Sequence, residues 1–131
     1  MKQRLLRTAL MLVLIFCSSA VWAEKQMYVR ITGSTMTFYY DENMTDGDYR
    51  VENLGWNGQD VTRVIFDSSF ADARPTSTGM WFDGFSKLES IEGISNLNTS
   101  QVTSMFMMFF ECNSITSLDL SNFDTSNVTD F

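Results

Sequence analysis

The sequence predicts an α/β solenoid, in which short parallel strands and short helices wind into stacked coils, with a β-hairpin cap at the N-terminal end. Three observations predict this fold class. An apolar pattern recurs at a nearly constant interval in the second half of the chain, short segments within each copy alternate apolar and polar residues, and Met- and Phe-rich runs separate those segments. A chain of 131 residues with 44% hydrophobic and 19% charged residues suits one globular domain.

Residues 1–23 have the pattern of a secretory signal peptide. Three basic residues precede an apolar run from Ala9 to Cys17, and a motif of small residues ends at Ala23. The apolar run of about ten residues is too short for a transmembrane anchor, which needs roughly 20. We therefore expect cleavage before Glu24 and a secreted or cell-surface location, with lipid attachment at Cys17 as a minor alternative.

The chain that remains after cleavage is strongly acidic. The full sequence has 9 basic and 16 acidic residues, and the predicted signal peptide contains three of the basic ones and none of the acidic ones. The remaining net charge is therefore 6 minus 16, or −10. Such a surface repels nucleic acid and anionic membranes and keeps an exported protein soluble. We expect no nucleic-acid partner and, after cleavage, no transmembrane anchor.

Residues 24–60 are expected to form the hairpin and cap region. The segments 25–32 and 35–42 alternate apolar and polar residues and are rich in Tyr, Val and Phe, and Gly33 lies in the turn between them. A solenoid needs an end unit whose outer face meets water, and this hairpin is the natural candidate. In the Gly-, Asn- and Asp-rich loop that follows, Trp56 is expected to close one end of the core.

Residues 61–131 repeat one pattern about two and a half times. Leu88 matches Ile115, and Thr99 matches Thr125 at an interval shorter by one position, because the earlier copy has one extra glycine. A fainter copy precedes them. We expect each copy to form one coil, so that neighbouring coils shield each other's apolar side chains from water.

Each coil is expected to contain a short strand and a short helix. Leu118-Asp119-Leu120 has the period of two that marks a half-buried strand, and the runs at about 78–85 and 104–110 suit short helices behind the strands. Polar residues between these elements are expected to bond the backbone at the turns. They are Thr99, Ser100, Thr125, Ser126 and Asn127.

Stacked strands would align outward side chains in two columns on one face of the sheet. The first column is Ile65, Glu92 and Asp119, and the second is Arg63, Ser90 and Ser117. A regular exposed row of side chains suits docking of a partner, and it is not a cleft that excludes water. We predict that these six residues, called the outer strip below, form a partner-binding surface.

The remaining residues give little support to an enzyme and predict no metal or cofactor. The sequence has no His and, after cleavage, a single Cys at position 112, which excludes Ser-His-Asp and Cys-His catalytic sets and thiolate clusters. Asp46-Gly47-Asp48 lacks the spacing of a calcium-binding loop. The alternative is a carbohydrate-active enzyme with paired carboxylates. A deep pocket with two carboxylates about 5 to 10 Å apart would support this alternative. No motif marks such a pair, and we predict no catalytic residues.

The repeat segment resembles a known family. "MFFECNSITSLDLSNFDTSNVT", residues 108–129, is similar to the repeat of the BspA-like leucine-rich repeat surface proteins, which are related to a repeat of unknown function first grouped from mycoplasma lipoproteins. Residues 64–78 and "MTFYYDEN", residues 36–43, resemble the segments that precede those repeats. The resemblance implies a leucine-rich-repeat-like solenoid. It also implies that Cys112 is a small buried hydrophobic residue, with a reactive thiol as the alternative.

The resemblance further implies a function. Members are exported bacterial proteins on or near the cell surface that engage other macromolecules, in some cases host matrix proteins or other bacteria. We therefore expect non-catalytic recognition or adhesion, with a host matrix protein or another bacterial surface protein as partner. Members carry many repeats, and the last coil here leaves Phe123, Val128 and Phe131 at an open edge. This pattern predicts that the chain is the N-terminal piece of a longer protein, or a fragment without independent function.

Overall fold

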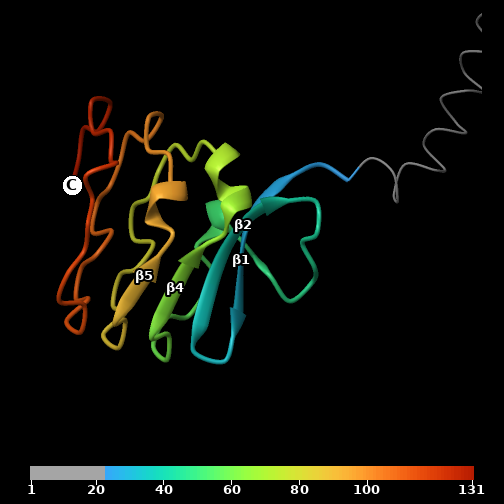
Figure 1. Ribbon diagram of the computed structural model, residues 1–131, viewed down its shortest axis with the longest axis horizontal. Coiled ribbons are helices and arrows are strands. Elements are labelled where there is room, and N and C mark those ends of the chain that lie inside the picture. The colour runs from blue at the N-terminus through green and yellow to red at the C-terminus, as the bar shows by residue number, and fades with distance from the viewer. Residues whose placement is uncertain (1–22) are drawn as a thin grey trace, which may run out of the picture.

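The computed structural model describes residues 23–131, and they contain one five-stranded sheet (Figure 1). The strands are β1 (Gln26–Thr32), β2 (Thr35–Asp41), β3 (Tyr49–Arg50), β4 (Arg63–Phe66) and β5 (Ser90–Glu92). Three short 3-10 helices accompany them, namely η1 (Val51–Asn53), η2 (Ser68–Asp72) and η3 (Ile94–Asn96). The predicted signal peptide, apart from Ala23, lies outside the described residues. Within residues 23–131, no helix has the length and apolar character needed to cross a membrane.

The sheet is mixed, and its order is β3-β1-β2-β4-β5. β1 is antiparallel to β2 and to β3, whereas β2 is parallel to β4 and β4 is parallel to β5. The N-terminal hairpin is therefore not a separate unit placed on the end of a solenoid. It supplies two central strands of the same sheet that continues into the repeat region.

The predicted leucine-rich-repeat-like solenoid of strands and helices is wrong, because the described residues contain no α-helix. The runs at 78–85 and 104–110 form chains of tight turns instead. Met80 and Met107 have φ angles of 61° and 54°, in the left-handed region that interrupts a right-handed helix. The fold is a small mixed sheet whose chain continues in coils of turns.

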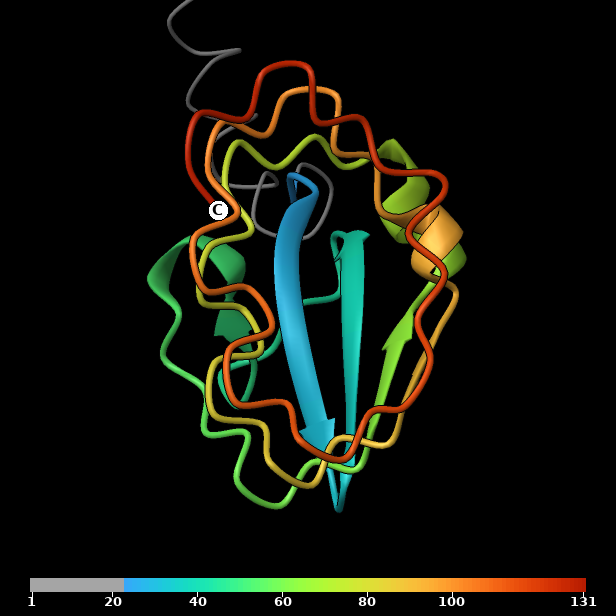
Figure 2. The same ribbon diagram turned by 90° about the vertical axis from the view of Figure 1, so that its left-hand side faces the viewer.

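The backbone hydrogen bonds of these runs explain why no helix forms. The N–H groups of every second residue from Thr78 to Gly84 donate to carbonyl oxygens of the next coil, at 2.8 to 3.0 Å. The acceptors are Ser104, Phe106, Met108 and Phe110. A helix would use these donors internally, and a run of about two turns has little helical stability of its own. In Figure 2 the last turns of the chain accordingly follow nearly the same closed path, one over another.

The strand predicted at Leu118-Asp119-Leu120 is also absent. No backbone ladder joins this segment to β5 among the described residues. The Asp119 carboxylate instead accepts a hydrogen bond of 2.9 Å from the backbone N–H of Ser121, a local contact that favours a turn. The sheet therefore ends at β5, and beyond it only isolated parallel bridges join Ser77 to Ser104 and Ser104 to Asp130.

The core lies on one face of the sheet and is rich in aromatic side chains. Phe38 on β2 is fully buried, and its ring lies 4.6 Å from that of Phe66 and 5.0 Å from that of Trp81, centroid to centroid. Leu88 and Leu97 extend the core along the coils, and both are fully buried. Alternation along β4 places Val64 and Phe66 in this core and Arg63 and Ile65 on the outer face.

Candidate functional site

Four residues of the outer strip lie side by side on β4 and β5. The register pairs Arg63 with Ser90 and Ile65 with Glu92, and all four point away from the core because Val64 between them points inward. The Arg63 guanidinium binds the Glu92 carboxylate through two hydrogen bonds of 2.7 and 2.8 Å. The centre of the strip is therefore an ion pair that joins neighbouring strands.

The ion pair sets the charge of the strip. Hydrogen bonding from Arg63 lowers the pKa of Glu92, and the same bonds raise the pKa of Arg63. Both side chains are about half exposed, at 46% and 51%, so water screens the pair and it adds little to folding stability. Both groups stay charged near neutral pH and within reach of a partner.

The structure does not bring the other two residues of the strip into the sheet. Ser117 and Asp119 are exposed and lie in a segment without strand structure. Hydrogen bonding from Ser121 lowers the pKa of Asp119. On the opposite side, Thr35 and Thr37 of β2 pair with Arg63 and Ile65 and widen the outer face. Sequence reasoning missed these two threonines because it treated the hairpin as a separate cap, and their alternation alone does not reveal the parallel pairing with β4.

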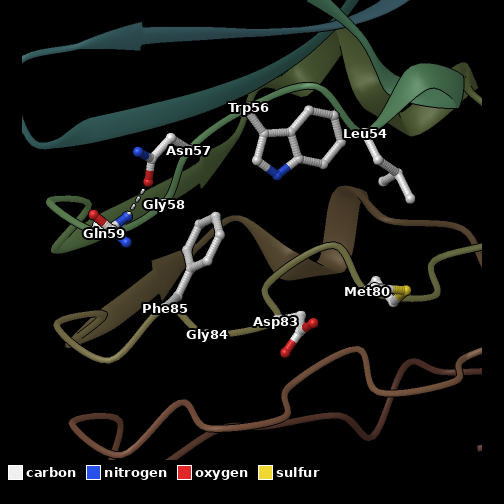
Figure 3. Close-up of a pocket in the computed structure, with 9 residues that line it drawn as sticks. All are labelled: Leu54, Trp56, Asn57, Gly58, Gln59, Met80, Asp83, Gly84 and Phe85. Atoms are coloured by element: carbon white, nitrogen blue, oxygen red, sulfur yellow. Dashed lines mark hydrogen bonds between the residues drawn. The ribbon is translucent and has the colours of Figure 1, made fainter.

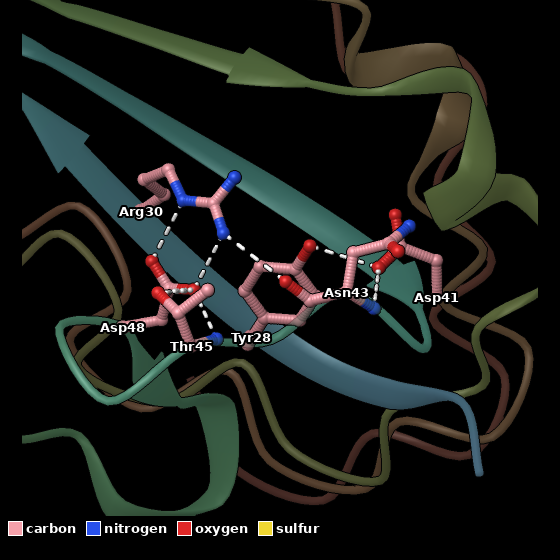
Figure 4. A network of polar contacts seen from close by, with 6 residues as sticks. All are labelled: Tyr28, Arg30, Asp41, Asn43, Thr45 and Asp48. Carbon is pink, nitrogen blue, oxygen red and sulfur yellow. Dashed lines mark hydrogen bonds and ion pairs between the residues drawn. The ribbon is translucent and has the colours of Figure 1, made fainter. Parts of the chain in front are cut away.

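The outer face of the hairpin is covered by the loop that precedes β3 (Figure 4). Arg30 on β1 binds Asp48 in this loop with hydrogen bonds of 2.8 and 2.7 Å. Its guanidinium lies 5.5 Å from the ring centroids of both Tyr28 and Tyr39, within the range of a cation–π interaction. The Tyr28 hydroxyl donates to the Asp41 carboxylate at 2.8 Å. This network holds the loop against the sheet.

The network shifts the pKa of both carboxylates in the same direction. Hydrogen bonds from Arg30 lower the pKa of Asp48, and the backbone and side chain of Thr45 add to this effect. Burial opposes ionisation of Asp41, but hydrogen bonds from Asn43 and Tyr28 outweigh it, so that the pKa of Asp41 is also lowered. Carboxylates with a depressed folded-state pKa stabilise the fold above their unfolded pKa and lose this contribution as pH falls through the folded value.

We therefore expect an acid-dependent loss of stability that the substitution Asp48→Asn reduces. The wild type should lose stability below about pH 4, near the ordinary pKa of aspartate, because protonation of Asp48 breaks its ion pair with Arg30. The variant should be less stable at pH 7 and should change less between pH 7 and pH 3. Urea unfolding at both pH values measures this, with exposed Asp46→Asn as the matched control. An equal acid loss in wild type and Asp48→Asn would contradict the assignment.

A pocket of about 380 Å³ lies between the loop after η1 and the turns at 78–85, called the first coil of turns below (Figure 3). Leu54, Trp56 and Gln59 line it from the loop, and Met80 and Asp83 line it from the coil. Figure 3 shows the two segments facing each other across the pocket. Sequence reasoning did not identify this pocket, since it assigned Trp56 only to the end of the core and treated the coil as a helix.

The pocket has a firmly held wall. The indole N–H of Trp56 donates to the backbone carbonyl of Trp81 at 3.0 Å. The Trp56 ring also packs edge to face with the ring of Phe38, with 6.2 Å between the ring centroids. Gly58 packs so closely on Phe85 that an added Cβ would lie 1.9 Å from the Phe85 ring. The loop therefore meets the coil through contacts that allow little displacement.

Several acidic residues gather near β3. Another depression, near β3, is lined by Glu24, Glu42, Asp46 and Asp48, and the Asp48 carboxylate forms an ion pair with Arg30. Among residues 23–131, no group of three or more His, Cys, Asp or Glu side chains is arranged to hold a metal ion.

Cys112 has the environment of a packed thiol. It is half-buried, and its Sγ–H donates to the Phe82 carbonyl at 3.0 Å. Burial raises the pKa of the thiol, and the negative charge of Asp83 adds to this effect. A raised pKa keeps the thiol protonated near neutral pH and lowers its reactivity.

Residues 74–131 match the model of a family described as Mycoplasma protein of unknown function, DUF285. This family is related to BspA-like repeat proteins. The matched segment includes β5, both coils of turns and the last segment of the chain. No curated protein and no solved structure matches the chain. The family description names no activity, ligand or partner.

Proposed function

We propose that this is an exported, non-catalytic recognition protein that binds another protein through the outer face of its sheet. The supporting observation is the parallel register of β4 and β5, which sets Arg63, Ile65, Ser90 and Glu92 side by side on an open surface. An open strip of charged, polar and apolar side chains presents several contacts at once to a second protein surface. It has no enclosed volume in which a small substrate could be held away from water.

The resemblance to BspA-like surface proteins supports the same proposal. The matched family is related to that group, and the N-terminal pattern of basic and apolar residues is typical of exported proteins. We therefore propose a secreted or surface-attached location, and a host matrix protein or another bacterial surface protein as the partner. The proposal does not require a leucine-rich-repeat fold.

Substituting Glu92 and Asp119 together by alanine is expected to weaken partner capture by at least tenfold and to leave folding intact. Loss of Glu92 removes the acceptor of the Arg63 ion pair and leaves an unpaired positive charge on the strip. Both side chains are exposed, so the unfolding midpoint should change little. Binding of the purified chain to a panel of purified matrix proteins and to whole bacterial cells measures the effect.

The matched control is Glu42→Ala with Asp46→Ala, which removes the same charge from the exposed loop before β3. This control should retain at least half of the wild-type affinity. An equal loss of affinity in both double variants would show that overall charge, and not the strip, carries the interaction. Wild-type affinity of the variant at Glu92 and Asp119 would show that the strip is not the binding surface. The absence of binding to every member of the panel would count against the proposed function itself.

A further inference from the structure

We propose that the pocket between Trp56 and Asp83, called the Trp56 pocket below, receives a lysine or arginine side chain from a cationic partner protein. This inference rests on the proposed recognition function and names the chemistry of the partner. The pocket lies apart from the outer strip, since its residues come from the loop after η1 and from the first coil of turns.

The charge balance of the described chain favours a cationic occupant. All six basic residues from Lys25 onward already have a partner within residues 23–131. Four form ion pairs with carboxylates, Arg74 donates to two backbone carbonyls, and Lys25 lies over the ring of Tyr40. Sixteen acidic residues face these six basic ones, so most carboxylates stay uncompensated. Such a field attracts positively charged partners and accelerates their association.

Asp83 brings one of these uncompensated carboxylates to the pocket. It is half-buried, it lines the pocket, and no basic group of residues 23–131 lies within salt-bridge distance of it. Partial burial strengthens the attraction between a carboxylate and an incoming cation, because fewer water molecules screen the charge. A charge-assisted hydrogen bond to Asp83 would hold the head group of the entering side chain.

The other lining residues match the stem of a long basic side chain. Leu54 and Met80 are 40% and 46% exposed, and they flank the pocket beside the indole of Trp56. Lysine and arginine bury an aliphatic stem on apolar surfaces and keep the charged head at a polar group. The indole can also attract the cation through its ring face. A volume of about 380 Å³ is ample for one such side chain.

The test uses N-acetyl-arginine amide as the probe and N-acetyl-citrulline amide as its neutral analogue of nearly the same shape. The described chain has two tryptophans, and Trp81 is 1% exposed. Binding in the pocket should therefore shift the indole N–H resonance of Trp56 and leave that of Trp81 nearly unchanged. We expect saturable binding of the arginine probe and at least tenfold weaker binding of citrulline. Equal binding of both probes would overturn the proposal, because the pocket would then recognise a neutral polar group.

The variant Asp83→Asn removes the charge with little change in shape, and Asp72→Asn is its matched control at an exposed site away from the pocket. We expect at least tenfold weaker arginine binding for Asp83→Asn and less than a twofold change for the control. Unchanged binding by Asp83→Asn would refute the assignment. If the arginine probe binds as expected while no partner protein binds, the proposed function fails and the pocket assignment stands. The probe comparison on the wild type decides the question even if Asp83→Asn folds poorly.

Discussion

Replacing Phe38 by alanine is expected to lower the free energy of unfolding by about 3 to 5 kcal/mol. The side chain is fully buried and its ring contacts five other aromatic rings. Those rings come from β4, from η2 and from the segments that flank the Trp56 pocket, so the resulting cavity would loosen the centre of the domain. Because small domains have a net stability of about 5 to 15 kcal/mol, this one change removes much of it.

The same substitution at Phe110 provides the control. Phe110 is 49% exposed, and we expect a change within about 0.5 kcal/mol, as is usual for exposed positions. Urea unfolding followed by circular dichroism at pH 7 measures both variants. Similar losses for Phe38→Ala and Phe110→Ala would mean that stability is not concentrated in the aromatic cluster around Phe38.

Gly93→Ala is the second large effect, with an expected loss of about 2 to 4 kcal/mol. Gly93 follows β5 with a φ of 67°, and an added Cβ would lie 2.4 Å from the backbone carbonyl oxygen of Phe66. The left-handed backbone costs a non-glycine residue about 1 kcal/mol. The contact with Phe66 adds to this, because a carbonyl of β4 cannot move aside without displacing the strand.

Gly33→Ala separates these two contributions. Gly33 has a φ of 61° in the hairpin turn, and an added Cβ there would meet no atom within 4 Å. We expect a loss of about 1 kcal/mol from backbone strain alone. Thermal unfolding of both variants gives the comparison. If Gly93→Ala cost no more than Gly33→Ala, the close approach to Phe66 would not constrain the fold.

Local pattern predicted some of the elements but not their assembly. The alternation in residues 25–42 indicated two strands, and β1 and β2 lie within that range. This prediction was possible because an amphipathic strand alternates apolar and polar side chains in consecutive residues. The same alternation could not show that β2 pairs with β4, since parallel pairing depends on residues far apart in the chain. This is why Thr35 and Thr37 were missed on the outer face.

The Met- and Phe-rich runs show where local pattern failed. Their apolar content suited a helix, but the N–H groups of Met80 and Phe82 bond carbonyls of the next coil. Apolar side chains spaced along a short run are compatible with either arrangement, and the neighbouring coil decides between them. The Trp56 pocket escaped sequence analysis for the same reason, because its two walls meet only after the chain has folded.

By itself, the sequence determined the acidic charge, the interval at which the chain repeats and the apolar residues that recur with it. The same interval separates Thr78 from Ser104, and the backbone N–H of Thr78 donates a hydrogen bond to the carbonyl of Ser104. Only the tertiary structure decided that the repeats form turns and that the hairpin joins their sheet. It also decided that Asp83 and Trp56, which are far apart in the sequence, line the same pocket. The physical reason is that each backbone N–H can donate a hydrogen bond within its own segment or to a neighbouring segment. Only the packing of the whole chain determines which acceptor it uses.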